Sequence, residues 1–164
     1  MAYKYGRSTY EDRAVSRYRT QVREVINRNV VVSLAPEQGF NVCLPVYDGG
    51  IDFILNREAQ AVRPETSTDT RKVQLKGRWT IDKKYNGRDI WMAFPVGDDW
   101  YLMPHDKMMS VAKTHTTALE TESWIKDGAY SWPKPTKVMM AQCEPYRFAP
   151  IARVAAEAAT EAGA

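Results

Sequence analysis

The residues whose types and spacing could do chemistry are Asp52, Gln74 and Lys76. Asp52 is the single ionisable residue of the apolar run Ile51 to Leu55, where a carboxylate is costly unless it is exposed, paired or bound to a metal. Gln74 and Lys76 are two residues apart in the run Lys72 to Arg78, so they would share one face of a strand. Carboxylate and amide oxygens suit Mg²⁺, and a nearby ammonium can stabilise charge on a phosphate. These residue types could therefore support metal-assisted chemistry at a phosphate group.

The same three residues also have structural interpretations. Asp52 could cap a turn or form an ion pair with Lys76, which would satisfy both charges. Gln74 could be an ordinary exposed residue of an edge strand. The residue types alone leave both interpretations open.

Two predicted strands, 51–55 and 72–78, must position these residues. The polar segment between them, including Arg63 to Thr68, lacks apolar periodicity and is predicted to be a loop. Side chains alternate along the second strand, so Val73, Leu75 and Gly77 share one face. The other face is polar and carries Lys72, Gln74, Lys76 and Arg78.

The remaining sequence predicts an α/β domain in which a helix covers a mixed sheet. Apolar residues at three-and-four spacing predict a helix over residues 10–38, although the β-branched run Val30 to Val32 leaves a strand at 30–35 as an alternative. The other predicted elements are strands at 40–46, 89–96 and 100–104 and short helices within 105–119 and 135–146. We expect a flexible arm at 1–9, a single domain at 10–150 and an alanine-rich tail at 151–164.

Composition narrows the class of protein. A chain of 164 residues with 44% hydrophobic residues can form one domain with a substantial core. It has no apolar run of about 18 residues, and its start, MAYKYGRSTYEDR, has no apolar signal region, so we expect a cytoplasmic protein without membrane contact. Cys43 and Cys143 are expected to be buried free thiols, and His105 to be a surface or loop residue rather than a general base.

Positive charge gathers beside the candidate site. Between Arg71 and Arg88 seven basic residues face a single acid, Asp82, and the first thirty residues carry seven basic residues against three acids. Such clusters suit a nucleic acid, whose phosphates they contact, although a solvated surface is the alternative. Most of the tryptophans are expected in the core, and Trp79, next to Arg78, is the best candidate for exposure and for stacking on a base. The candidate nucleic-acid-binding residues are Lys72, Arg78, Lys83, Lys84 and Arg88, with Trp79 and Tyr85 as further candidates.

The order of these residues resembles the PD-(D/E)xK phosphodiesterase superfamily, in the variant in which Gln replaces the second acid. The resemblance extends over residues 13–148 and is carried by three runs: GFNVCLPVYDGGIDFIL, VQLKG and DIWMAFPVGDDWYLMPHD. It implies a restriction-endonuclease-like core, with a mixed sheet of about five strands, an N-terminal helix and short C-terminal helices. It also implies a metal-dependent endonuclease that hydrolyses phosphodiester bonds in duplex or branched DNA and works as a homodimer or higher homo-oligomer.

The resemblance also implies roles for individual residues. Asp52, Gln74 and the backbone carbonyl of Leu75 would be ligands of Mg²⁺ or Mn²⁺, and Lys76 would support the attacking water. Members of the superfamily commonly carry an acid on the N-terminal helix, where this chain has Arg28. Glu24, one turn earlier, or Asp48 would then be the alternative outer ligand.

Two other functions fit the same sequence. One is a catalytically inactive nucleic-acid-binding protein of the same fold, which the missing helix acid and the Gln in place of an acid favour. The other is a structural or interaction protein whose basic surface recruits an acidic partner.

Overall fold

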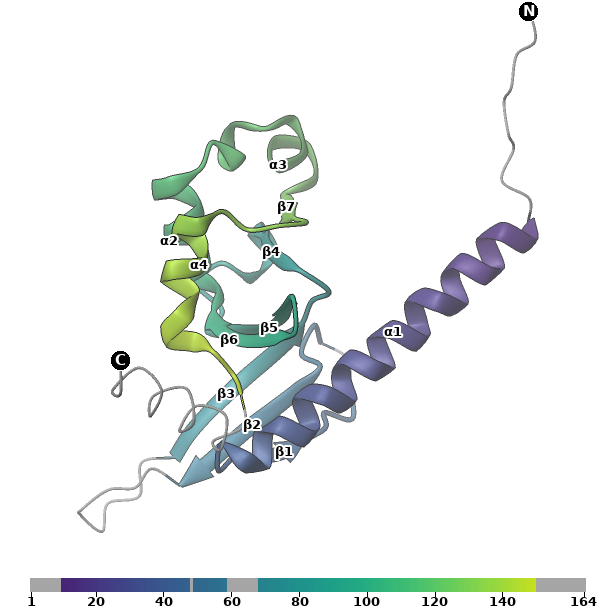
Figure 1. Ribbon diagram of the computed structural model, residues 1–164, viewed down its shortest axis with the longest axis vertical. Helices are drawn as coiled ribbons and strands as arrows, with labels where there is room; N and C mark the ends of the chain where they lie inside the picture. The colour runs from purple at the N-terminus through teal and green to yellow at the C-terminus, as the bar shows by residue number, and fades with distance from the viewer. Residues whose placement is uncertain (1–9, 48, 59–67, 150–164) are drawn as a thin grey trace, which may run out of the picture.

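The structure is a computed structural model in which residues 10–47, 49–58 and 68–149 are described. The predicted arm at 1–9, the predicted tail at 151–164, Asp48 and most of the predicted loop lie outside the described residues. The chain forms an α/β fold, as the sequence predicted, with an N-terminal helix, a mixed five-stranded sheet and short C-terminal helices (Figure 1).

The N-terminal helix α1 spans Tyr10–Glu37. Its end is fixed by Gly39, whose left-handed φ of 77° a residue with a side chain would adopt only with strain. The alternative of a strand at 30–35 is wrong. Val31 and Ala35 are fully buried one turn apart, so packing against the sheet outweighs the β-propensity of the valines.

The main sheet is mixed because one pair of neighbouring strands is parallel. Its order is β1-β2-β3-β5-β6; β3 pairs with β5 in parallel, and the other neighbours are antiparallel. The strands are β1 (Asn41–Cys43), β2 (Phe53–Glu58), β3 (Thr68–Leu75), β5 (Ile90–Val96) and β6 (Asp99–Pro104). The two central strands lie two to four residues closer to their connecting loop than predicted. Asp52 therefore precedes β2, and Lys76 follows β3.

A second sheet of two strands was missed by the sequence analysis. β4 (Trp79–Asp82) pairs with β7 (Ala129–Trp132), so residues 79–82, for which no strand was predicted, form one. The β4 strand is followed by the 3₁₀ turn η1 (Lys83–Tyr85). The helices of the second half are α2 (His105–His115), α3 (Glu122–Asp127) and α4 (Lys137–Cys143), with 3₁₀ turns η2 (Ala118–Glu120) and η3 (Glu144–Tyr146).

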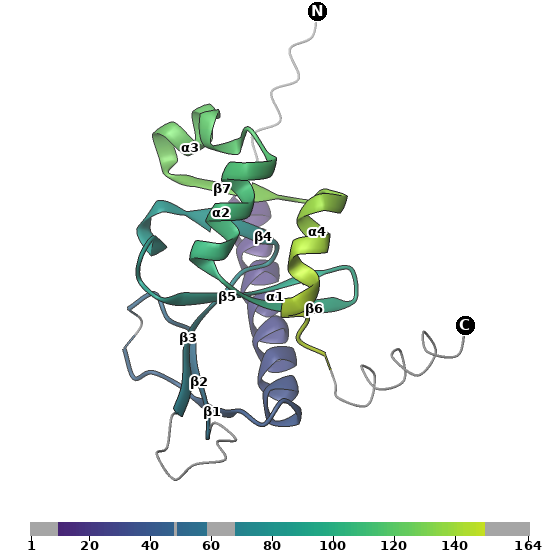
Figure 2. The ribbon, with the colours of Figure 1, turned by 90° about the vertical axis from the view of Figure 1, so that its left-hand side faces the viewer.

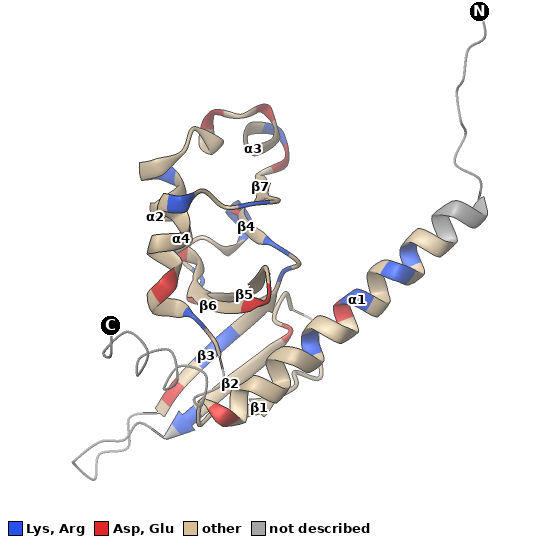
Figure 3. Cartoon of the chain, in the orientation of Figure 1, with Lys and Arg blue, Asp and Glu red and all other residues tan. Residues whose placement is uncertain are grey.

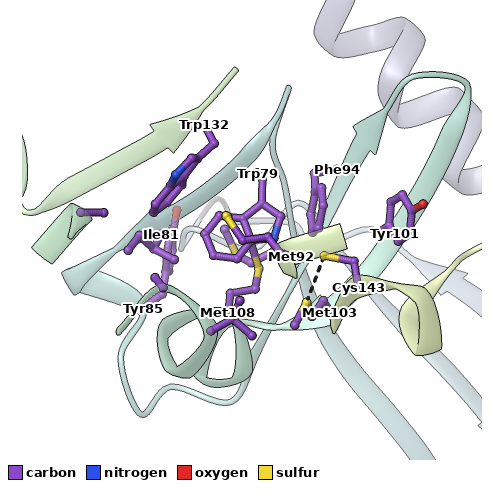
Figure 4. Close-up of a cluster of buried hydrophobic side chains, with 14 of the residues drawn as sticks. Trp79, Ile81, Tyr85, Met92, Phe94, Tyr101, Met103, Met108, Trp132 and Cys143 are labelled. Carbon is purple, nitrogen blue, oxygen red and sulfur yellow. Dashed lines mark hydrogen bonds between the residues drawn. The ribbon is translucent and has the colours of Figure 1, made fainter. Parts of the chain in front are cut away.

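The main sheet separates two apolar cores. Side chains alternate along β5, so Met92 and Phe94 enter one core while Ala93 enters the other. The first core lies under α2, α4 and the small sheet and is rich in sulfur and aromatic rings (Figure 4). The second lies under the C-terminal part of α1. α1 and the pair α2 and α4 lie on opposite sides of the strands (Figure 2).

Two expectations for single residues are wrong. His105 is the first residue of α2 and is 1% exposed, because its Nε2 accepts a hydrogen bond of 3.1 Å from the backbone N–H of Asp82. Burial lowers the pKa of His105, in keeping with a neutral ring that accepts this bond. Cys43 is exposed, because the short β1 lies at the edge of the sheet, whereas Cys143 is buried as expected. None of the described helices is both long and apolar enough to cross a membrane.

Candidate functional site

Asp52 is joined to β3 by its main chain and by its side chain. The register pairs Phe53 with Val73, which brings Asp52 to the level of Gln74. The Asp52 N–H donates to the carbonyl of Val73 at 2.8 Å, and Oδ2 accepts from the N–H of Leu75 at 2.6 Å. One bond holds the Asp52 main chain and the other its carboxylate, so the carboxylate has a fixed position at the end of the strand.

The Gln74 side chain links Asp52 to Tyr85. Its Nε2 donates to Asp52 Oδ2 at 2.5 Å, and its Oε1 accepts from the Tyr85 hydroxyl at 3.0 Å. The amide therefore presents its nitrogen to the carboxylate. Half a turn of the amide would present its oxygen instead, and the Tyr85 hydroxyl could then accept from Nε2, since a phenol both donates and accepts.

Lys76 completes this group. Its N–H donates to the carbonyl of Ala93 at 2.8 Å, which continues the β3–β5 pairing by one residue and keeps Lys76 on the same side as Gln74. Its Nζ lies 3.5 Å from the Tyr85 hydroxyl and 5.3 Å from the centre of that ring. The structure thus brings the three predicted residues together around Tyr85.

Tyr85 was a candidate for contact with nucleic acid, and its burial contradicts that role. Its side chain is 2% exposed, because the turn after β4 directs the ring inward against the ring of His105. Tyr85 instead holds Gln74 in place and contacts Lys76.

The Asp52 carboxylate has no cationic partner among the described residues. No described Lys or Arg nitrogen lies within 4.0 Å of it. The alternative of a structural Asp52–Lys76 ion pair is therefore wrong. The described groups that meet its charge are neutral donors, which leaves it available to a cation from outside.

A cleft of about 1090 Å³ opens above these residues. One wall is α1, whose N-terminal part extends beyond the strands; the other wall includes Asp52, residues 74–78 and β4 (Figure 1). Thr80 and Ser131 lie on this second wall, where their hydroxyls are 2.9 Å apart. The residues of α1 that line the cleft are Val15, Ser16, Arg19, Thr20, Arg23, Glu24, Asn27 and Arg28.

The cleft is positively charged. Of the described residues, five basic ones line it against the two acids Asp52 and Glu24, and blue segments recur along α1 in Figure 3. The basic residues are Arg19, Arg23, Arg28, Lys76 and Arg78. A concave site with this excess of cations favours an anionic ligand such as a phosphodiester chain.

Most of the predicted phosphate-binding residues do not line the cleft; Arg78 does. Lys72 donates to the carbonyl of Arg88 at 2.8 Å. Lys84 lies 3.3 Å from Asp82, and the Lys83 ammonium lies over the ring of Trp124. The charge run is continuous in sequence, but Lys83 and Lys84, in the turn after β4, do not line the cleft.

Trp79 was the tryptophan expected to be exposed, and this expectation is wrong. Its side chain is fully buried in the first core, where the ring centre lies 4.7 Å from that of Trp132 (Figure 4). Side chains of consecutive residues along a strand point to opposite faces, so an exposed Arg78 does not predict an exposed Trp79.

The sequence analysis missed the α1 wall of the cleft. Arg19, Arg23 and Asn27 follow each other at four-residue spacing and so share one helix face. The basic excess of the first thirty residues, combined with this spacing, was the signal that could have found it. Glu24 and Arg28 line the same cleft, whereas Asp48 lies outside the described residues.

The donors near Asp52 fit a hard cation that needs few protein ligands. They are the Asp52 carboxylate, the Leu75 carbonyl and, after half a turn of its amide, the oxygen of Gln74. The described residues contain no group of three or more His, Cys, Asp or Glu side chains that could hold a metal ion. Mg²⁺ is often held by one or two carboxylates, with water and substrate phosphate as its other ligands, so this oxygen set suits it.

Comparisons with protein-family models, with curated proteins and with solved structures found no match for the chain. The assignment of a function therefore depends on the site itself.

Proposed function

We propose that the protein is a metal-dependent endonuclease that hydrolyses phosphodiester bonds in duplex or branched DNA, as the PD-(D/E)xK resemblance implies. The observation that carries the proposal is the position of Asp52, Gln74 and Lys76 at a cleft whose walls are rich in Arg and Lys. We place the protein in the cytoplasm, and a cleft of this charge suits the phosphates of a nucleic acid.

Each residue has a distinct part in this proposal. Asp52, the Gln74 oxygen and the Leu75 carbonyl would hold Mg²⁺ or Mn²⁺, with Glu24 as a further acid on the opposite wall. The ion, when bound, would supply positive charge at the phosphate and a more acidic water. Lys76 would stabilise the negative charge that develops on the phosphate oxygens. The cleft arginines would hold the flanking phosphates in place.

Tyr85 would act as a positioning residue. Its hydroxyl fixes the Gln74 amide in the observed orientation and can also accept from Nε2 once the amide has turned. The same hydroxyl contacts Lys76, so one buried phenol limits the motion of two neighbouring side chains.

An inactive nucleic-acid-binding protein is the second candidate. Two observations favour it: the site has a single carboxylate beside Gln74, and the Gln74 amide presents its nitrogen to that carboxylate. In this case the cleft would bind DNA and the divalent ion would have no effect.

The test is cleavage of supercoiled plasmid and of a branched DNA by the purified chain with Mg²⁺, with Mn²⁺ and with EDTA. We expect nicking with either metal and none with EDTA. Lys76→Ala should reduce cleavage by about 10²-fold or more while DNA affinity changes little, since one of five cleft cations is lost. Cleavage retained in Lys76→Ala would contradict its role. Salt-dependent binding without any cleavage would favour the inactive candidate.

A further inference from the structure

The outward face of α1 carries an apolar stripe that nothing in the described residues covers. Its members are strongly exposed for residues of this kind: the exposed fraction is 67% for Tyr18 and 56% for Val25 and for Ile26. The outer stripe, as we name this set, consists of Val15, Tyr18, Val22, Val25 and Ile26. Contiguous apolar surface of this kind is typical of an interaction site.

The outer stripe lies on the opposite side of α1 from the body of the protein. At 100° per residue, Tyr18, Val22 and Val25 are roughly half a turn around the helix from Asn27 and Val31, which face inward. Of the stripe residues, only Val15 also borders the cleft. A partner on the stripe would therefore leave the cleft open.

The spacing of the stripe matches a helix partner of the same kind. Val15, Tyr18, Val22 and Val25 follow each other at intervals of three, four and three residues, which is the a/d pattern by which identical helices interlock side chains. An isologous pair of such helices needs only one self-complementary surface per chain. Because each body lies behind its own helix, two copies can meet stripe to stripe without a collision of their bodies.

The area also suits a second copy. A standard interface buries ~800 Å² per partner, so the stripe would form its apolar centre and the polar residues flanking it would supply the rest. In the part of the chain that the structure describes, the N-terminal half of α1 also lacks a packed apolar face, and helices in water gain most of their stability from such packing.

We propose that the protein forms a homodimer in which the outer stripes of two α1 helices pack against each other. The dimer contains two clefts, each on the far side of its helix from the interface. This inference concerns the back of α1 and does not depend on the proposed chemistry.

The experiment is sedimentation equilibrium of the full chain over micromolar to hundred-micromolar concentrations. We expect a particle of twice the chain mass. The double variant Tyr18→Glu/Val22→Glu should raise the dimer dissociation constant at least about 100-fold, because it would bury four unpaired carboxylates in each dimer. Arg17→Glu is the matched control: Arg17 is exposed on the same helix and belongs to neither the stripe nor the cleft.

The stripe residues are exposed in the single chain, so the double variant should fold, and its circular dichroism at low concentration should match that of Arg17→Glu. A wild-type chain that stays monomeric at every concentration would overturn the proposal, whatever else covers the stripe. A double variant that dimerises as tightly as the control would overturn it equally. Neither outcome requires a cleavage assay, so a failure here is separate from a failure of the proposed nuclease activity.

Discussion

Asp52 and Asp69 lie at opposite ends of the β2–β3 pair, and they differ in whether arginine side chains neutralise the carboxylate. Asp69 accepts from Arg57 at 3.0 Å and from Arg71 at 2.9 and 2.8 Å. The hydrogen bond from Arg71 is the main reason why the pKa of Asp69 is lowered, with Arg57 adding to it. Among the residues that the structure describes, Asp52 accepts from the neutral N–H groups of Gln74 and Leu75 and from no cation.

The difference separates a structural carboxylate from an available one. The two arginines that neutralise Asp69 also lie over the ring of Phe40, so that end of the sheet is closed by its own side chains. The charge of Asp52 faces a cleft and has no such partner among the described residues. A site that must receive a cation gains from leaving its carboxylate unpaired.

The largest expected effect is on cleavage. Asp52→Asn should reduce metal-dependent cleavage by about 10³-fold or more, because it removes the single anionic ligand beside Gln74. Asp69→Asn should leave cleavage of the folded protein unchanged. Both variants would be measured on the same plasmid under single-turnover conditions. Equal losses in the two variants would remove the distinction between the two carboxylates.

The next effect is on DNA affinity. Arg19→Gln/Arg23→Gln should weaken DNA binding by roughly 10–100-fold near 0.1 M salt and reduce the slope of log affinity against log salt by about 2, because two phosphate contacts are lost. Arg17→Gln, on the same helix but outside the cleft, should change neither quantity. Fluorescence anisotropy over a salt series measures both. An equal loss in Arg17→Gln would mean that DNA does not lie in the cleft.

The smallest effect is on stability. Asp69→Asn should lower the free energy of unfolding at pH 7 by about 1–2 kcal/mol, because two half-buried arginines lose their acceptor. Since the pKa of Asp69 is lowered from 3.8, its contribution is present above that pH and is lost as the pH falls below it.

Urea unfolding at pH 7 and at pH 3 checks this prediction. The difference between wild type and Asp69→Asn should shrink at pH 3. Asp52→Asn should cost less than Asp69→Asn at pH 7, because no cation is left unpaired. A larger cost for Asp52→Asn would reverse the comparison.

The sequence was sufficient to predict the elements whose contacts are local. Gln74 and Lys76 share a face because a strand alternates, and the antiparallel β2–β3 pair then brings Asp52 beside Gln74. The hairpin of β5 and β6 followed from its aromatic runs and its Gly-Asp-Asp turn.

The parts that could not be predicted depend on distant segments. β4 pairs with β7 some fifty residues later, and only that pairing buries Trp79 against Trp132. Likewise, the cleft needs α1 to lie across the end of β3, and nothing in the local pattern of Arg19 or Arg23 specifies that packing.

The partial anchoring of α1 has a mechanical consequence. The helix is fully buried at Val31 and Ala35 and exposed through most of its N-terminal half, so it is a lever with its pivot near one end. At a rise of 1.5 Å per residue, a rotation of about 5° at Val31 would move Arg19 by about 1.5 Å. The packing of α1 around Val31 would therefore set the width of the cleft, which lies along the N-terminal part of the helix. A second copy bound along the exposed N-terminal part of α1 would restrict this rotation and hold the cleft at one width.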